Sequence, residues 1–216
     1  MHATINIRDE ELQLLPKRAV YWPVQQTLII ADVHFGKTGH FRKNGIAMLS
    51  EMPFVELENL ARLVLEICPK KIIFLGDLFH SEMNNEWGIF EDWLAHQSAK
   101  IVLVNGNHDA HLLQHAHLKD LQTIDSLEME PFIFTHEPLP EKTALYNLAG
   151  HIHPGIKLKG RGRQSLRLPA FCFGQDQGLL PAFGLTTGLM IQKMNKQTRY
   201  FVSSGEEVFE AKNVMK

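Results

Sequence analysis

Short apolar runs that end in polar residues recur between residues 27 and 153. The runs are 27–31, 71–75, 101–104, 132–135 and 148–149, and Asp, Asn or His follows each of them within two residues. Runs of this length, rich in β-branched and aliphatic residues, are typical of strands that are buried on both faces. The pattern therefore predicts five strands with polar side chains at their ends.

Helical periodicity lies between these runs. Apolar residues recur at intervals of three and four over 53–67, which predicts an amphipathic helix that starts near Pro53 and stops before Pro69. The spacing of the aromatic residues in 87–94 indicates a second helix, and a short third one is expected after Asp109. Strands that alternate with helices favour an α/β fold.

The last third of the chain predicts strands without helices between them. Segments 166–168, 189–193 and 199–202 have strand character and are punctuated by Gly and Pro, which mark turns. We expect a second, antiparallel-rich sheet that packs on the first to give a layered sandwich. Because no internal repeat or low-complexity linker interrupts the chain, residues 1–216 are expected to form a single domain.

Composition narrows the classes of protein that fit. The 216 residues include 44% hydrophobic and 21% charged residues, as in globular domains with a sizeable core. The net charge of −2 excludes a strong overall attraction to nucleic acid or anionic membranes. Cys68 and Cys172 have no metal-binding or redox spacing. With no signal peptide and no membrane span in the sequence, a cytoplasmic location is expected.

The polar residues after the five runs are of the types that bind metal ions. Ligands bind outside the carboxyl ends of strands in α/β sheets, so these side chains are expected to converge. Carboxylate, amide and imidazole groups without any thiolate suit Mn, Fe, Zn or similar divalent ions. The candidate metal ligands are Asp32, His34, Asp77, Asn107, His136, His151 and His153.

A pair of metal ions would account for so many ligands. Asp77 is the candidate bridge between the ions, because Gly76 lets the backbone turn sharply and approach them closely. Two ions roughly 3.5–4 Å apart clamp a phosphoryl group and generate a hydroxide nucleophile near neutral pH. A histidine would suit the remaining task, protonation of the leaving oxygen.

Five short blocks occur in the order Asp32-Val33-His34, Gly76-Asp77-Leu78-Phe79-His80, Gly106-Asn107-His108-Asp109, His136 and Gly150-His151-Ile152-His153. They resemble the motif blocks of the calcineurin-like metallophosphoesterase superfamily. The resemblance implies a four-layer α/β/β/α sandwich. It also implies one metal held by Asp32, His34, Asp77 and His153, and a second held by Asp77, Asn107, His136 and His151.

The same resemblance implies roles for residues near the metals. His108 would be the general acid that contacts the phosphate, and Asp109 would set its orientation and charge. Many members carry Asp where His80 stands, so His80 is expected to support the metal ligands or to contact the substrate. Lys37 and Arg42 lie in a polar stretch after the first block and are candidate phosphate contacts. Mn is the expected ion, with Fe, Zn, Ni or Mg as alternatives.

Further motifs resemble a narrower group. They are Leu14-Leu15-Pro16, Ala19-Val20-Tyr21-Trp22-Pro23, His34-Phe35-Gly36-Lys37, Phe41-Arg42, Gly45-Ile46 and Leu180-Pro181-Ala182-Phe183-Gly184. Together they are similar to the bacterial ligase-associated DNA damage response endonucleases of the superfamily. This resemblance implies DNA or another phosphodiester as substrate, and a repair system that includes a DNA ligase, a helicase and a nuclease.

Two other functions stay open. The near-neutral charge and the lack of a DNA-binding motif also suit a phosphatase or pyrophosphatase of a nucleotide, sugar-phosphate or lipid-linked small substrate. A non-catalytic, partner-binding scaffold predicts lost metal ligands, whereas the full set is present. A basic stretch after the last block suits either contact with a nucleic-acid backbone or a solvated hairpin. Its residues are Lys157, Lys159, Arg161, Arg163 and Arg167.

Overall fold

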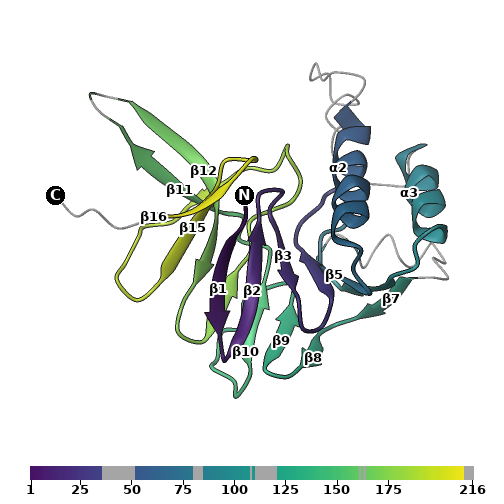
Figure 1. The fold of residues 1–216 in the computed structure, drawn as a ribbon, viewed down its shortest axis with the longest axis horizontal. Coiled ribbons are helices and arrows are strands. Elements are labelled where there is room, and N and C mark those ends of the chain that lie inside the picture. Colours follow the sequence, from purple (N-terminus) through teal and green to yellow (C-terminus); the bar gives the residue numbers. More distant parts are fainter. Residues whose placement is uncertain are drawn as a thin grey trace.

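Two β-sheets stack face to face, and two helices cover the outer face of the first sheet (Figure 1). This arrangement comes from a computed structural model, which describes residues 1–35, 52–79, 85–107, 109, 121–160, 162 and 164–211. The predicted α/β sandwich is confirmed. None of the helices in these ranges is long and apolar enough to cross a membrane.

The first sheet has seven strands, which follow one another in chain order across the sheet. They are β1 (Ala3–Ile7), β2 (Glu10–Leu15), β3 (Ala19–Trp22), β4 (Thr27–Ile30), β5 (Lys71–Leu75), β6 (Lys100–Val104) and β7 (Leu121–Ile124). Strands β1 to β4 pair antiparallel, and β4 to β7 pair parallel. The carboxyl ends of β4, β5 and β6 therefore lie at one edge of the sheet.

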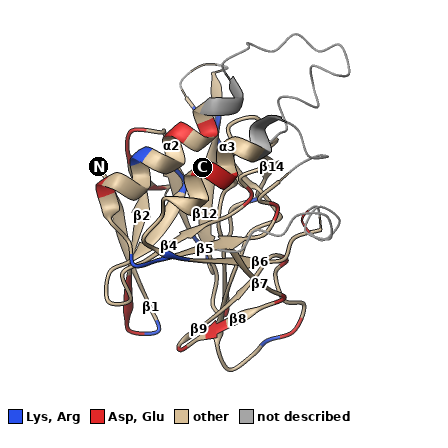
Figure 2. Cartoon of the chain, turned by 90° about the vertical axis from the view of Figure 1, so that its right-hand side faces the viewer, with Lys and Arg blue, Asp and Glu red and all other residues tan. Residues whose placement is uncertain are grey.

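Both faces of the parallel strands are covered. Because successive side chains point to opposite faces of a strand, Ile30 and Phe74 join one apolar cluster with the helices, whereas Ile29 and Ile73 face the second sheet. The helices are α2 (Met52–Ile67) and α3 (Asn85–Ala95). They contact each other, and α2 carries both basic and acidic residues (Figure 2). The Glu58–Arg62 ion pair is exposed.

The second sheet has nine strands. They are β8 (Leu127–Met129), β9 (Phe132–Thr135), β10 (Tyr146–Ala149), β11 (Pro154–Lys159), β12 (Ser165–Phe173), β13 (Gln177–Leu179), β14 (Met190–Ile191), β15 (Arg199–Ser203) and β16 (Val208–Ala211). The order is β14-β11-β12-β13-β10-β9-β8, and β15 joins β12 to β16. Antiparallel pairs predominate, as predicted, but β10 runs parallel to both β9 and β13.

The structure refines two expectations and does not describe the segment of a third. The five strands with polar ends divide between the sheets, with β4, β5 and β6 in the first and β9 and β10 in the second. Three of the four implied layers belong to the described ranges. Within those ranges no helix covers the outer face of the nine-stranded sheet, where Ile156, Tyr200 and Val202 form a smaller apolar cluster. The helix expected after Asp109 lies outside the described residues.

Candidate metal centre

Polar side chains from both sheets meet where β4, β5, β9 and β10 end. Two groups of side chains have the geometry of metal ligands, and within each group the potential ligand atoms all lie within 4.8 Å of one another. The first group is Asp32, His34 and His153, and the second is Asp77, His136 and His151. Six of the seven predicted ligands are thus brought together as two sets of three.

Asp32 is the anchor of the first group. Its side chain is fully buried, and its Oδ1 lies 3.4 Å from Nε2 of His153. The Nε2 atoms of His34 and His153 are also 3.4 Å apart. The backbone N–H of His151 donates to both carboxylate oxygens of Asp32, at 3.1 and 2.9 Å. These bonds hold the loop after β10 against the loop after β4.

His136 is the centre of the second group. Its Nδ1 lies 2.9 Å from the carbonyl oxygen of Leu75, which can only accept a hydrogen bond, so Nδ1 carries the proton. In the neutral ring Nε2 then holds a lone pair. This atom lies 3.5 Å from Oδ1 of Asp77 and 3.1 Å from Nδ1 of His151. An acceptor nitrogen fixed by a backbone carbonyl is the usual arrangement of a metal-binding histidine, so the residues fit a metal ion.

The two groups are neighbours. Oδ1 of Asp32, in the first group, lies 3.9 Å from Nδ1 of His136, in the second. Asp77 lies within ligand distance of the second group, and its bridging position between the two ions stays a prediction. A site that hydrolyses phosphoesters with two metal ions requires two ligand groups that lie next to each other.

The backbone at the centre is strained. Five of the seven candidate ligands have positive φ angles, between 46° and 64°, although none of them is glycine. They are Asp32, His34, Asp77, His151 and His153. Each such residue costs on the order of 1–3 kcal/mol, and strain of this kind concentrates at functional sites. The surrounding contacts must therefore impose these conformations.

Two glycines allow the loops to approach. A Cβ on Gly106 would lie 2.2 Å from the backbone nitrogen of Asp77, which is impossible without movement of the loop. Gly76 has a φ of 76°, and a Cβ there would lie 2.3 Å from Nδ1 of His136. In both places a motif glycine is needed because the backbone packs directly against a candidate ligand of another motif.

Asp109 joins two of the loops. Its Oδ1 accepts a hydrogen bond from the backbone N–H of Phe79, and its Oδ2 accepts one from Gly106, both at 3.1 Å. Burial raises the pKa of the Asp109 carboxyl to about 6. The carboxylate therefore ties the loop after β5 to the loop after β6. Its predicted action on His108 stays a prediction, because His108 lies outside the described residues.

Asn107 has a partner that the sequence reasoning missed. Its Nδ2 donates to Oε1 of Glu137 at 2.8 Å, and the same Oε1 lies 3.9 Å from Nε2 of His151. This hydrogen bond lowers the pKa of the Glu137 carboxyl. With Nδ2 engaged, Oδ1 of Asn107 remains available as a ligand. The one signal in the sequence was a carboxylate directly after His136.

Residues 183–184 form backbone hydrogen bonds with the first motif. The backbone N–H groups of Phe183 and Gly184 donate to the carbonyl oxygens of Ala31 and Asp32, at 2.8 and 3.1 Å. The guanidinium of Arg18 donates to the carbonyl of Gly184 at 3.3 Å, and burial lowers the pKa of this arginine. Lys37, Arg42 and His80, the other predicted site residues, lie outside the described residues.

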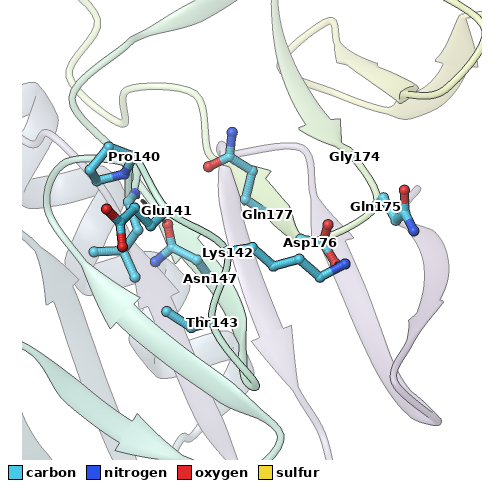
Figure 3. Close-up of a pocket in the computed structure, with 10 residues that line it drawn as sticks. Pro140, Glu141, Lys142, Thr143, Asn147, Gly174, Gln175, Asp176 and Gln177 are labelled. Atoms are coloured by element: carbon cyan, nitrogen blue, oxygen red, sulfur yellow. Dashed lines mark hydrogen bonds and ion pairs between the residues drawn. The ribbon is translucent and has the colours of Figure 1, made fainter.

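A separate hollow of about 290 Å³ lies beside the starts of β10 and β13, at the opposite ends of these strands from the metal centre (Figure 3). Some of its polar groups have partners within the hollow or beside it. Nζ of Lys142 lies 2.8 Å from Oδ1 of Asp176. The amide of Asn147 accepts from Leu139 and donates to Thr135.

Comparisons with known proteins agree with this site. The calcineurin-like phosphoesterase model matches residues 26–179, which include every candidate ligand. The structure of the Pseudomonas putida nuclease MPE has 32% sequence identity and a TM-score of 0.82, over 98% of this chain and 100% of that chain. The phosphoesterase Yfce from E. coli has 16% identity and a TM-score of 0.40, over 82% of this chain and 86% of that chain. No curated protein matched the sequence.

The family match extends over more than half of the chain, and the likeness to the nuclease extends over nearly all of it. Both confirm the resemblance found in the motifs, and the nuclease agrees with the narrower endonuclease group. Members of the family use divalent metals, and the two ligand groups fit that requirement. The chain therefore belongs to the calcineurin-like phosphoesterase family and is a metal-dependent phosphoester hydrolase.

Proposed function

We propose that the protein is a nuclease that hydrolyses phosphodiester bonds of DNA with the help of two divalent metal ions. The observation that carries the proposal is the pair of adjacent ligand groups, centred on Asp32 and His136. The 32% identity to a nuclease, over nearly the whole chain, supports the choice of a phosphodiester over a monoester.

The proposed ligands are Asp32, His34, Asp77, Asn107, His136, His151 and His153, with Asp77 shared by both ions. Their oxygen and nitrogen donors suit Mn first, and Fe, Zn, Ni or Mg as alternatives. When bound, the two ions would neutralise the phosphoryl oxygens and activate a water molecule for attack.

The chain's own residues prepare the site before any ion binds. The proton on Nδ1 of His136 is held by the carbonyl of Leu75, which leaves Nε2 as an electron-pair donor. Glu137 takes the amide N–H of Asn107 and so leaves its Oδ1 for a ligand bond. Because both donors are already oriented, little conformational entropy is lost when a metal binds.

We assign the proton transfer to His108. Its imidazolium would donate a proton to the leaving oxygen, and Asp109, the next residue, would hold this loop through its bonds to Phe79 and Gly106. Lys37, Arg42 and His80 are proposed substrate contacts. A DNA repair role with a ligase, a helicase and a nuclease, and a cytoplasmic location, complete the proposal and rest on the sequence.

The experiment is a comparison of two synthetic substrates. Metal-stripped protein is assayed on bis-p-nitrophenyl phosphate and on p-nitrophenyl phosphate, with and without added Mn²⁺. We expect Mn²⁺-dependent cleavage of the diester, followed by cleavage of single- or double-stranded DNA. Cleavage of the monoester alone would replace the proposal with a small-substrate phosphatase. Absence of all cleavage with the metals bound would favour a scaffold.

A further inference from the structure

A basic hairpin begins at the metal centre. Strand β11 starts at Pro154, directly after His153, and returns as β12. The two strands extend away from the body of the molecule (Figure 1). Residues 154–173, which include both strands and their connection, contain no Asp or Glu, whereas the whole chain has more acidic than basic residues. The positive charge is therefore local to this hairpin.

The basic residues share one face of the hairpin. In the antiparallel register Lys157 stands opposite Arg167, and Lys159 stands opposite Ser165. Residues directly opposite each other, or two apart on one strand, project to the same side. Lys157, Lys159 and Arg167 are all exposed. Arg161 and Arg163 lie outside the described residues and carry none of this argument.

The other face of the hairpin is apolar. Ile156 pairs with Leu168 and Leu158 pairs with Leu166, in alternation with the basic positions. Ile156 is buried in the apolar cluster on the outer face of the second sheet, and Leu158 and Leu168 pack against it. This packing fixes which face of the hairpin points outward. The basic face is thus held in position by the fold.

The basic face lacks counter-charges. Within the described ranges, Lys157, Lys159 and Arg167 make no ion pair or side-chain hydrogen bond. Like charges directly opposite each other in an antiparallel pair are destabilising. The Lys157–Arg167 pair therefore costs some stability in the free protein, and a bound polyanion would offset this cost.

We propose that this face binds the phosphodiester backbone of the nucleic acid whose scissile bond lies in the metal centre. The proposal rests on the proposed function and gives its substrate a binding surface. Lys157 and Lys159 are two residues apart, or about 6.8 Å along an antiparallel strand. Measured along the axis of a duplex, this span equals about two phosphate steps of one strand, each of roughly 3.4 Å. Each lysine can thus neutralise a different phosphate.

A nucleic acid fits this face better than an anionic membrane does. Proteins that bind membrane surfaces combine basic residues with apolar side chains that enter the lipid. The hairpin carries its leucines on the opposite face from Lys157 and Arg167. Gly155 and Pro169, at the start of this side, are buried, and the exposed residues that remain are Lys157, Lys159, Ser165 and Arg167, none of which is a large apolar anchor. The surface is suited to backbone phosphates alone.

The test compares two double variants of the full-length protein. Lys157→Ala/Arg167→Ala removes two charges from the hairpin. The control, Lys70→Ala/Lys100→Ala, removes one charge directly before β5 and one at the start of β6, at the opposite ends of these strands from the metal centre. Binding of a fluorescein-labelled DNA duplex to the metal-free proteins is followed by anisotropy, because cleavage cannot occur without metal. Circular dichroism and thermal melting verify the fold of each variant.

We expect roughly tenfold weaker binding for the hairpin variant, and a slope of log affinity against log salt reduced by about 1.8. The control should bind like the wild-type protein. Mn²⁺-dependent hydrolysis of bis-p-nitrophenyl phosphate should be unchanged in both variants, because so small a diester does not reach the hairpin. Weaker DNA binding in the hairpin variant alone would show that the loss comes from this face and not from the change in net charge.

Several results would overturn the proposal. Equal binding by the hairpin variant and the wild-type protein would do so, as would equal losses in the hairpin variant and the control. Tight binding of phosphatidylserine vesicles without binding of DNA would assign the face to membranes instead. If no protein cleaves any substrate, the proposed function fails by itself, and the metal-free binding comparison still decides whether the hairpin binds DNA.

Discussion

His153 has a φ of 48°, a left-handed backbone conformation in which a side chain is unfavourable. Replacement by Ala or by Gly removes the imidazole equally, but only Ala keeps the strain. We expect His153→Gly to have a free energy of unfolding about 1 kcal/mol higher than His153→Ala, the reverse of the usual order. Urea denaturation of the metal-free variants measures the difference. A more stable Ala variant would contradict the strained backbone.

Substitutions of Glu137 test whether this residue orients Asn107 as a metal ligand. Oε1 of Glu137 accepts the Nδ2–H of Asn107, and Gln at this position retains an acceptor oxygen. We expect Glu137→Ala to weaken Mn²⁺ binding by about 10-fold, as is common for residues that orient a metal ligand, and Glu137→Gln to weaken it less. Titration calorimetry provides the affinities. Equal affinities for both variants and the wild-type protein would remove this role from Glu137.

Variants of Asp77 and His108 can distinguish a loss of metal binding from a loss of proton transfer. If Asp77 is shared by both ions, Asp77→Ala should lose metal and activity together. His108→Ala should retain the metals but slow turnover by about 10²–10⁴, as expected for a lost general acid. Metal content by mass spectrometry, measured beside the rate of diester hydrolysis, distinguishes these outcomes. Equal metal loss in the two variants would contradict the role assigned to His108.

At the scale of elements, the apolar runs that end in polar residues were easier to predict than the N-terminal strands. The runs at 71–75 and 132–135 became β5 and β9 with the same bounds, because short apolar runs rich in β-branched and aromatic residues are typical of buried strands. Strands β1 to β3 were not predicted. Their hairpin turns are formed by Arg8, Asp9 and Arg18 with positive φ, so the usual Gly or Asn-Gly signal was absent.

Six of the seven candidate ligands that the sequence predicts belong to the two groups, because each of the six follows a strand within four residues. The partnership of Glu137 with Asn107 could not be predicted, since it joins loops from different sheets. The same applies to Asp109, whose bonds to Phe79 and Gly106 depend on how two loops pack. Side chains that act through tertiary contacts leave no periodic signal in the sequence.

Helix α3 contains a glycine that its packing does not require. Gly88 is exposed, and a Cβ there would meet no atom within 4 Å. Ala restricts the unfolded chain more than Gly, so Gly88→Ala should raise the free energy of unfolding by about 0.5–1 kcal/mol. Gly205 is equally open but has a φ of 94°, so Gly205→Ala should be destabilising. The prediction would be contradicted if urea denaturation showed that both variants change the free energy of unfolding in the same direction.

For the whole molecule, the metal centre joins the two sheets. The first ligand group combines Asp32 and His34, which follow β4, with His153, which follows β10. The second combines Asp77, which follows β5, with His136, which follows β9, and with His151. Each proposed ion would therefore cross-link the seven-stranded sheet to the nine-stranded sheet. Its binding energy is available only when the sandwich is assembled.

Metal binding should accordingly stabilise the entire fold. A ligand that binds only the folded state adds about 2.7 kcal/mol to the free energy of unfolding at 100 times its dissociation constant. We expect Mn²⁺ to raise the melting temperature of the wild-type protein and of Lys70→Ala/Lys100→Ala, and EDTA to reverse the rise. Asp77→Ala should show little change. If Mn²⁺ binds the wild-type protein without raising its melting temperature, the ions do not hold the sheets together, because folded and unfolded chains would then bind them equally.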